Sequence, residues 1–238
     1  MSASFSIDTA QARGADAPRS PRGFVAWVDG AGAFLLCLDD RATLGGLAGR
    51  ADVRLTSDLG AEHATIERSG EGYVVEAAGP TIVACDSPGR AGGVSPPRTG
   101  RSRSHGSGRV VDGRTNLNHN DELVLYREGG GAVRLRFLRP NALTATSVLT
   151  VVSDHRTEPR YDGIVLFAEA CVFGPGSDAH IRCRQWEETA LLFRRDDRLW
   201  CKSASPLEIN GRPAKGPAAV GSGDHVTASN LSFRLEAL

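Results

Sequence analysis

Residues 44–66 read LGGLAGRADVRLTSDLGAEHATI, and this stretch is the best guide to the fold class of the chain. Polar and apolar residues alternate in two short segments, 52–55 and 64–68. Alternation with a period of two is typical of strands that bury one face. Turn residues separate these segments, and similar segments recur about every 8–12 residues along the chain. The pattern predicts a β-sandwich of short strands.

The composition is that of a globular protein without a charge bias. The chain has 238 residues, of which 40% are hydrophobic and 24% charged. Its 28 basic residues balance its 28 acidic residues, so overall charge favours neither nucleic acid nor a membrane surface. The 28 glycines and 12 prolines favour short strands over a helical bundle. No run of 18 apolar residues occurs, and we expect no membrane span.

Sequence motifs of catalysis and metal binding are missing. The chain has no P-loop, GxSxG or HExxH motif, and its five cysteines form no CxxC pair or zinc-ligand spacing. We therefore expect no enzyme, no catalytic residues, no metal and no cofactor. The apolar runs around most cysteines are typical of buried thiols in the reducing cytoplasm. Histidines in polar or turn contexts are expected to face solvent: His105, His119, His155, His180 and His225.

Two segments lack a strand pattern. Residues 1–22 are rich in Ser, Ala, Arg and Asp without the apolar stretch of a secretory signal, and we expect a disordered tail. Residues 86–109 contain five arginines and almost nothing apolar, so we expect a disordered basic insert between two strands.

An internal repeat organises the rest of the chain. Residues 163–175 mirror residues 34–46, and the later strand segments follow in the same order. The later pairs are 177–181 with 50–55, 190–193 with 64–66, 198–202 with 73–76, 209–211 with 111–113, 223–226 with 120–123, and 232–235 with the closing strand. We therefore expect two sandwiches, at residues 23–140 and 162–238, joined by a connector at 141–161.

The quoted stretch resembles the signature of a forkhead-associated (FHA) domain. The shared features are the turn glycine Gly45, the segment Ala51–Leu55 and the segment His63–Ile66. The resemblance covers residues 24–138 and, with fewer matching positions, 162–238. It implies an all-β fold of two tandem antiparallel β-sandwiches of the SMAD/FHA type, whose loops at one end hold a phosphothreonine peptide.

The positions that hold the phosphopeptide in FHA domains carry other residues here. The family's arginine after the turn glycine corresponds to Gly46, and its Ser-Arg pair corresponds to Gly60 and Ala61. Its Asn-Gly pair corresponds to Asp112 and Gly113. Glycine and alanine side chains offer a phosphate dianion no hydrogen bond, and a carboxylate repels it. The family's conserved histidine corresponds to His63, which the resemblance implies is a buried structural residue.

The second copy shows a similar loss. Its turn pair is Gly174 and Pro175, and proline brings neither a charge nor a backbone N–H. Only Asn210 and Gly211 keep a residue pair of the family. Phosphothreonine recognition is therefore expected to be lost or altered in both copies.

These features predict a non-catalytic protein-interaction module, by family analogy an adaptor or scaffold in Ser/Thr-kinase-linked signalling. The expected partner is a protein, with phosphoproteins among the candidates. One alternative is a phosphopeptide reader that uses the backbone amides of Gly45 and Gly46 with Arg50 or Arg68. Another is a nucleic-acid-associated protein acting through the arginine-rich segment, which the neutral net charge disfavours. The sequence names neither the partner nor the oligomeric state.

Overall fold

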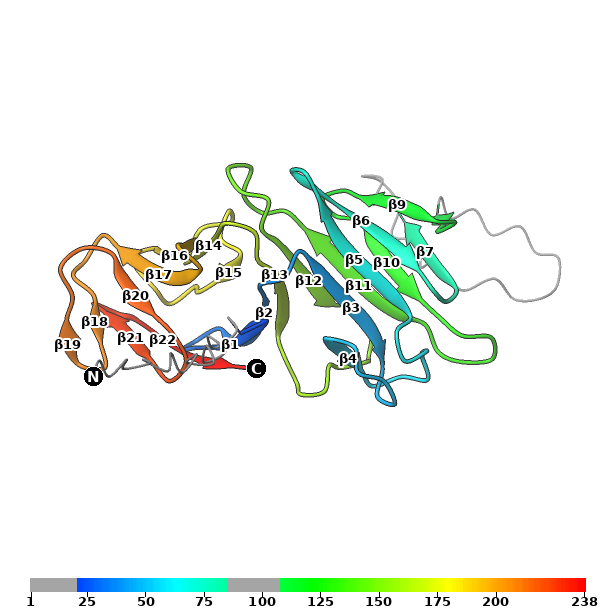
Figure 1. The fold of residues 1–238 in the computed structure, drawn as a ribbon, viewed down its shortest axis with the longest axis horizontal. Coiled ribbons are helices and arrows are strands. Elements are labelled where there is room, and N and C mark those ends of the chain that lie inside the picture. The colour runs from blue at the N-terminus through cyan, green and yellow to red at the C-terminus, as the bar shows by residue number, and fades with distance from the viewer. Residues whose placement is uncertain (1–20, 85–107) are drawn as a thin grey trace, which may run out of the picture.

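The fold consists of β-strands in all parts of the chain that the structure describes. The structure is a computed structural model that describes residues 21–84 and 108–238. The described ranges contain β-strands and no helices, and the strands form three mostly antiparallel sheets (Figure 1). The all-β prediction is confirmed. The predicted disorder of the tail and of the insert concerns residues that lie, apart from 21–22 and 108–109, outside the described ranges.

The longest sheet has twelve strands and extends through both halves of the molecule (Figure 1). In sheet order these are β19 (Arg212–Pro213), β18 (Glu208–Ile209), β21 (His225–Ala228), β22 (Leu231–Ala237), β1 (Gly23–Val28), β2 (Gly32–Cys37), β13 (Gly163–Leu166), β12 (Ser147–Val151), β11 (Val133–Leu138), β10 (Glu122–Leu125), β7 (Thr81–Ala84) and β8 (Gly108–Val110). The central neighbours β2 and β13 run parallel, whereas the other neighbours in this sheet are antiparallel.

Two five-stranded sheets pack on the long sheet. The first short sheet contains β4 (Val53–Leu55), β3 (Arg41–Gly46), β5 (Ala64–Ser69), β6 (Gly72–Ala77) and β9 (Arg114–Leu117). The second short sheet contains β15 (Ile181–Arg182), β14 (Ala170–Gly174), β16 (Ala190–Arg195), β17 (Arg198–Ser203) and β20 (Ala218–Val220).

Each short sheet encloses its own hydrophobic core with the long sheet. The first core contains Phe137 from β11, and the second core contains Phe173 from β14. Neighbouring residues of β2 enter different cores, Leu35 the first and Leu36 the second. Because neighbours along a strand point to opposite faces, the two short sheets lie on opposite faces of the long sheet.

The two central strands are buried on both faces. In β13, Ile164 and Leu166 enter the first core, whereas Val165 enters the second. All three side chains are at most 3% exposed. Continuous apolar runs are typical of strands that are covered on both faces, which explains why these segments do not alternate with polar residues.

The two halves share one order of eleven strands. Each strand from β2 to the β19 edge matches the strand eleven places away in the chain. The order β2-β1-β22-β21-β18-β19 thus corresponds to the order β13-β12-β11-β10-β7-β8. The match extends to single hydrogen bonds. The Oδ2 atoms of Asp121 and Asp224 accept backbone N–H groups of Asn118 and Gly221, both at 2.8 Å. Strands β1–β11 and β12–β22 are therefore equivalent units.

The strand pairing differs from the expected division into sandwiches. The β1–β2 hairpin, expected in the first sandwich, joins β22 and lines the second core. The expected connector 141–161 contains β12, which pairs with β11. Residues 108–109 of the expected insert belong to β8. The physical reason is the connection 139–146, because strands joined by a short connection usually pair with each other.

Because β2 serves both cores, we predict that the two halves unfold together. Leu35→Ala and Leu36→Ala should each lower the free energy of unfolding by about 2–5 kcal/mol through loss of buried surface and cavity formation. Both variants should shift one and the same transition in differential scanning calorimetry. Two resolved transitions, with only one moved by each variant, would contradict a common folding unit.

Candidate functional site

The loops indicated by the family resemblance meet at one end of the first short sheet. Strand β3 ends at Gly46, and the connection between β4 and β5 returns to it. The N–H of Gly46 donates to the carbonyl oxygen of Gly60 at 2.9 Å. We name the two loops, residues 46–50 and 56–63, the first rim.

Close backbone packing explains the glycines of the first rim. A Cβ atom on Gly45 would lie 2.2 Å from the carbonyl oxygen of Ala61, and one on Gly46 would lie 2.5 Å from that of Leu59. The loop backbone thus fills the space in which a side chain at Gly46 would begin. Because the Gly46 N–H already bonds to Gly60, it is not free to bind an anion.

The two arginines proposed as compensating cations lie in different places. Arg50 is exposed on the first rim. Arg68 lies near the opposite end of β5, where its N–H donates to the carbonyl oxygen of Asp40 at 2.7 Å. Its guanidinium bonds to Asp40 at 2.6 Å and to Glu169 at 3.2 Å. Arg68 therefore belongs to the junction between the halves and not to the rim.

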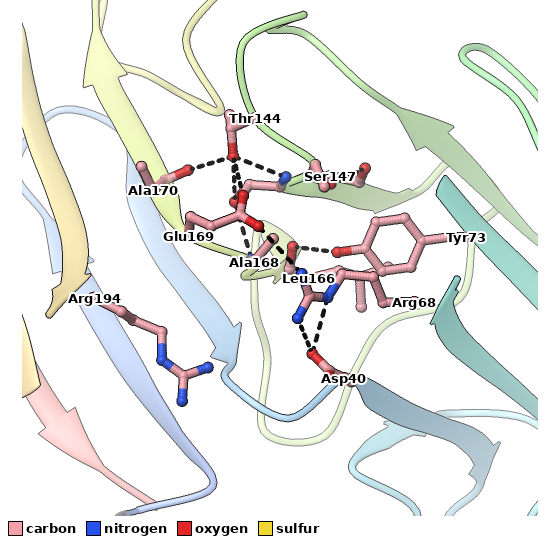
Figure 2. A network of polar contacts seen from close by, with 12 residues as sticks. Asp40, Arg68, Tyr73, Thr144, Ser147, Leu166, Ala168, Glu169, Ala170 and Arg194 are labelled. Carbon is pink, nitrogen blue, oxygen red and sulfur yellow. Dashed lines mark hydrogen bonds and ion pairs between the residues drawn. The ribbon is translucent and has the colours of Figure 1, made fainter. Parts of the chain in front are cut away.

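Figure 2 shows this junction, where Arg68 of the first half meets Glu169 of the second. Glu169 also accepts the hydroxyl of Thr144 at 3.5 Å, and the Tyr73 hydroxyl donates to the carbonyl oxygen of Leu166 at 3.0 Å. Burial raises the pKa of the Tyr73 phenol. Both carboxylates are mostly exposed, so each ion pair contributes little stability. The network joins side chains of both halves at their junction.

The pair Asp112 and Gly113 lies on the same side of the first short sheet as the rim. It precedes β9, whose first residue Arg114 pairs with Glu76 near the end of β6. Gly113 has a φ of 71°, which suits glycine in a turn. Asp112 is exposed and adds negative charge to this region, which opposes phosphate binding.

The second half has a corresponding rim at the end of β14. A Cβ atom on Gly174 would lie 2.8 Å from the Thr189 hydroxyl oxygen, so this glycine also packs closely. The carbonyl oxygen of Pro175 accepts a hydrogen bond from Nε of the exposed Arg182 at 3.4 Å. The motif comparison misses Arg182, because the family pattern places its arginine directly after the turn glycine.

Asn210 and Gly211 form a structural turn away from this rim. They join β18 to β19 with φ values of 54° and 74°, as Asn-Gly pairs do in two-residue hairpins. Asn210 accepts the His225 N–H at 2.9 Å and donates to Asp224 at 2.7 Å. By strand order their equivalent in the first half is the β7–β8 connection, which corrects the sequence alignment with Asp112 and Gly113.

His63 is a buried residue behind the first rim. Its side chain is 3% exposed, and Nε2 lies 3.0 Å from the carbonyl oxygen of Pro80. Its own carbonyl oxygen accepts the N–H groups of Ala78 and Gly79 at 2.9 and 3.0 Å. These bonds connect the β4–β5 and β6–β7 loops, so the histidine braces the rim.

His180 is also buried, and the expectation of a solvated side chain was wrong. Its Nδ1 accepts the Val172 N–H at 2.9 Å, which leaves Nε2 to donate to the carbonyl oxygen of Thr146 at 3.1 Å. Burial lowers the pKa of His180 to about 4. A second ring proton would meet the Val172 N–H instead of an acceptor. The signal in the sequence is the neighbouring Ile181, which continues an apolar pattern.

Two of the exposed large apolar side chains lie close to the features described above. Leu47 on the first rim and Trp27 on β1 are each 48% exposed. The indole N–H of Trp27 donates to Glu236 at 3.1 Å. Hollows of about 530 and 580 Å³ flank Trp27 on its two sides. Such side chains are typical anchors of protein interfaces.

Comparison with known proteins adds no assignment. No protein-family model matches the chain, and no curated protein matches it. Within residues 21–84 and 108–238, no group of three His, Cys, Asp or Glu side chains could hold a metal ion. Among the same residues, no helix has the length and apolar character needed to span a membrane.

We predict that an arginine cannot be restored at the first rim. Gly46→Arg places Cβ against the Leu59 carbonyl oxygen and should lower the free energy of unfolding by about 1–3 kcal/mol. Gly60→Ser is the matched control, because its Cβ would meet only a His63 ring atom at 3.9 Å. Urea unfolding compares the two variants. Equal stability of Gly46→Arg and the unsubstituted protein would show that the rim can open.

His180 should make stability depend on pH. Its pKa is about 4 in the folded chain against 6.5 in the unfolded chain, so unfolding takes up a proton between these values. Stability is full above pH 6.5 and falls as the pH drops toward 4, with a loss of about 2 kcal/mol at pH 5. His180→Asn should remove this loss when urea unfolding is measured at pH 7 and pH 5. His119→Asn, at an exposed site, should keep it.

Proposed function

We propose that this protein is a non-catalytic protein-interaction module built from two FHA-type sandwiches in which phosphothreonine recognition is lost. The observation that carries the proposal is the packing of the first rim, where Gly46 lies against the backbone of the facing loop. The shared eleven-strand order supports treating each half as one unit of the SMAD/FHA type. A role as an adaptor or scaffold in kinase-linked signalling follows from the family resemblance alone.

The chemistry of phosphate binding supports this loss. A phosphate dianion needs fixed hydrogen-bond donors and positive charge held close together. The first rim instead presents Leu47 and Ala61 to solvent, with Asp112 near the same end of the sheet. Arg50 is the one basic residue of the two rim loops, which carry no arginine or hydroxyl at the family positions. The exposed Arg127 reaches the rim, but it pairs with the Asp58 carboxylate at 3.1 Å. A rim of this composition favours an unphosphorylated, partly apolar protein surface.

The structure does not favour the two alternatives. A reader based on backbone amides needs the Gly46 N–H, which bonds to Gly60, and the nearby charge of Arg68, which bonds to Asp40 and Glu169. The nucleic-acid alternative depends on residues 86–109, of which only 108–109 are described. The exposed Trp27 supports a protein partner instead.

Calorimetric titration with a phosphothreonine peptide library and its unphosphorylated counterparts tests the proposal. We expect no binding that depends on the phosphate, because neither rim supplies the necessary donors. Micromolar binding that disappears after phosphatase treatment would refute it. In that case Arg50→Ala and Arg182→Ala, compared with the exposed control Arg41→Ala, would show which rim holds the phosphate.

A further inference from the structure

The two equivalent units of the chain exchange their first hairpins. In each unit, the first strand pairs with the last strand of the other unit. β1 pairs with β22, and β12 pairs with β11. The corresponding side-chain pairs match as well, because Trp27 lies opposite Arg234 and Thr150 lies opposite Arg136. The same set of strands could form an unexchanged sheet in which β1 lay beside β11 and β12 beside β22.

The exchanged hairpins complete both hydrophobic cores. From the β1–β2 hairpin, Phe24, Phe34 and Leu36 enter the second core, which otherwise consists mainly of residues after 164. From the β12–β13 pair, Leu149 and Ile164 enter the first core. Without the hairpin of the other unit, each core would lose one wall and the adjacent sheet would gain an open edge.

Contacts beyond the strand ladders follow the same exchange. The Tyr73 hydroxyl of the first short sheet donates to the Leu166 carbonyl oxygen of β13. In the second short sheet, Arg194 donates to the Leu38 carbonyl oxygen after β2 at 2.8 Å. The N–H of Phe167 donates to the carbonyl oxygen of Cys37 at 2.9 Å, directly between the units.

We infer that the chain is a hairpin-exchanged dimer of one eleven-stranded unit, joined into a single polypeptide. The surface that each unit presents to the other is an interaction site for a second copy of that unit. This surface consists of the edge of the last strand and the side of the core that the hairpin of the other unit covers. The halves 21–140 and 141–238 therefore remain partners when the peptide link between them is cut, and neither keeps its fold alone.

The test uses the full chain with a protease site inserted between Ala142 and Leu143, which are exposed. The folded protein is oxidised, cleaved and analysed on a denaturing gel without reductant. In a Cys85→Ser background, Trp27→Cys with Arg234→Cys should link the two fragments by a disulfide. The matched control, Trp27→Cys with Arg136→Cys, reports the unexchanged arrangement. Both of its positions lie in the first fragment, where a disulfide would make that fragment migrate faster on the same gel, and we expect no such change.

The reciprocal pair Arg136→Cys with Thr150→Cys keeps the test decisive if the Trp27 variants fail to fold, because it should also link the fragments. The cleaved protein without added cysteines should elute as one particle and unfold in one transition. A disulfide between positions 27 and 136 would overturn the inference. Halves that separate after cleavage and keep their β-sheet circular dichroism would overturn it equally.

Discussion

The structure depends on the burial of β2 and β13 on both faces. A strand in a two-layer sandwich normally shows one face to solvent, but these two strands separate two cores. Their side chains point alternately into one core and the other, so polar residues have no place along them. The two short sheets can then occupy opposite faces of one continuous sheet. The two halves are therefore not independent domains joined by a linker, because β2 and β13 contribute side chains to both cores.

At the rim of the first half, backbone packing occupies the place that the family resemblance gives to a ligand-binding side chain. Where the family resemblance places an arginine, the chain has a glycine against which a neighbouring loop closes by a backbone hydrogen bond. That bond uses the Gly46 N–H, so position 46 offers an anion neither a side chain nor this amide. Behind the rim lies the buried His63, whose hydrogen bonds connect two loops.

Much of the secondary structure could be predicted from the sequence, because the signals are local. The alternation in 52–55 and 64–68 predicts strands where the structure has them. The partners of the strands could not be predicted, since two equivalent units offer β1 two chemically similar neighbours, β11 and β22. Only the length of the connection between β11 and β12 separates these choices. The position of Arg68 was missed for a related reason, because proximity in sequence placed it beside the rim although it lies at the other end of β5.

Pairing of the first strand with the last, with Phe24 opposite Ala237, has a consequence for biosynthesis. The first core can be completed once β13 has been synthesised, whereas the second core waits for β22. Until then Phe24, Phe34 and Leu36 of the β1–β2 hairpin lack the strands that cover them in the folded protein. Domains ordinarily fold in the order in which they are made. Here the second core takes side chains from strands far apart in the order of synthesis, so the β1–β2 hairpin stays partly unburied until β22 has been made.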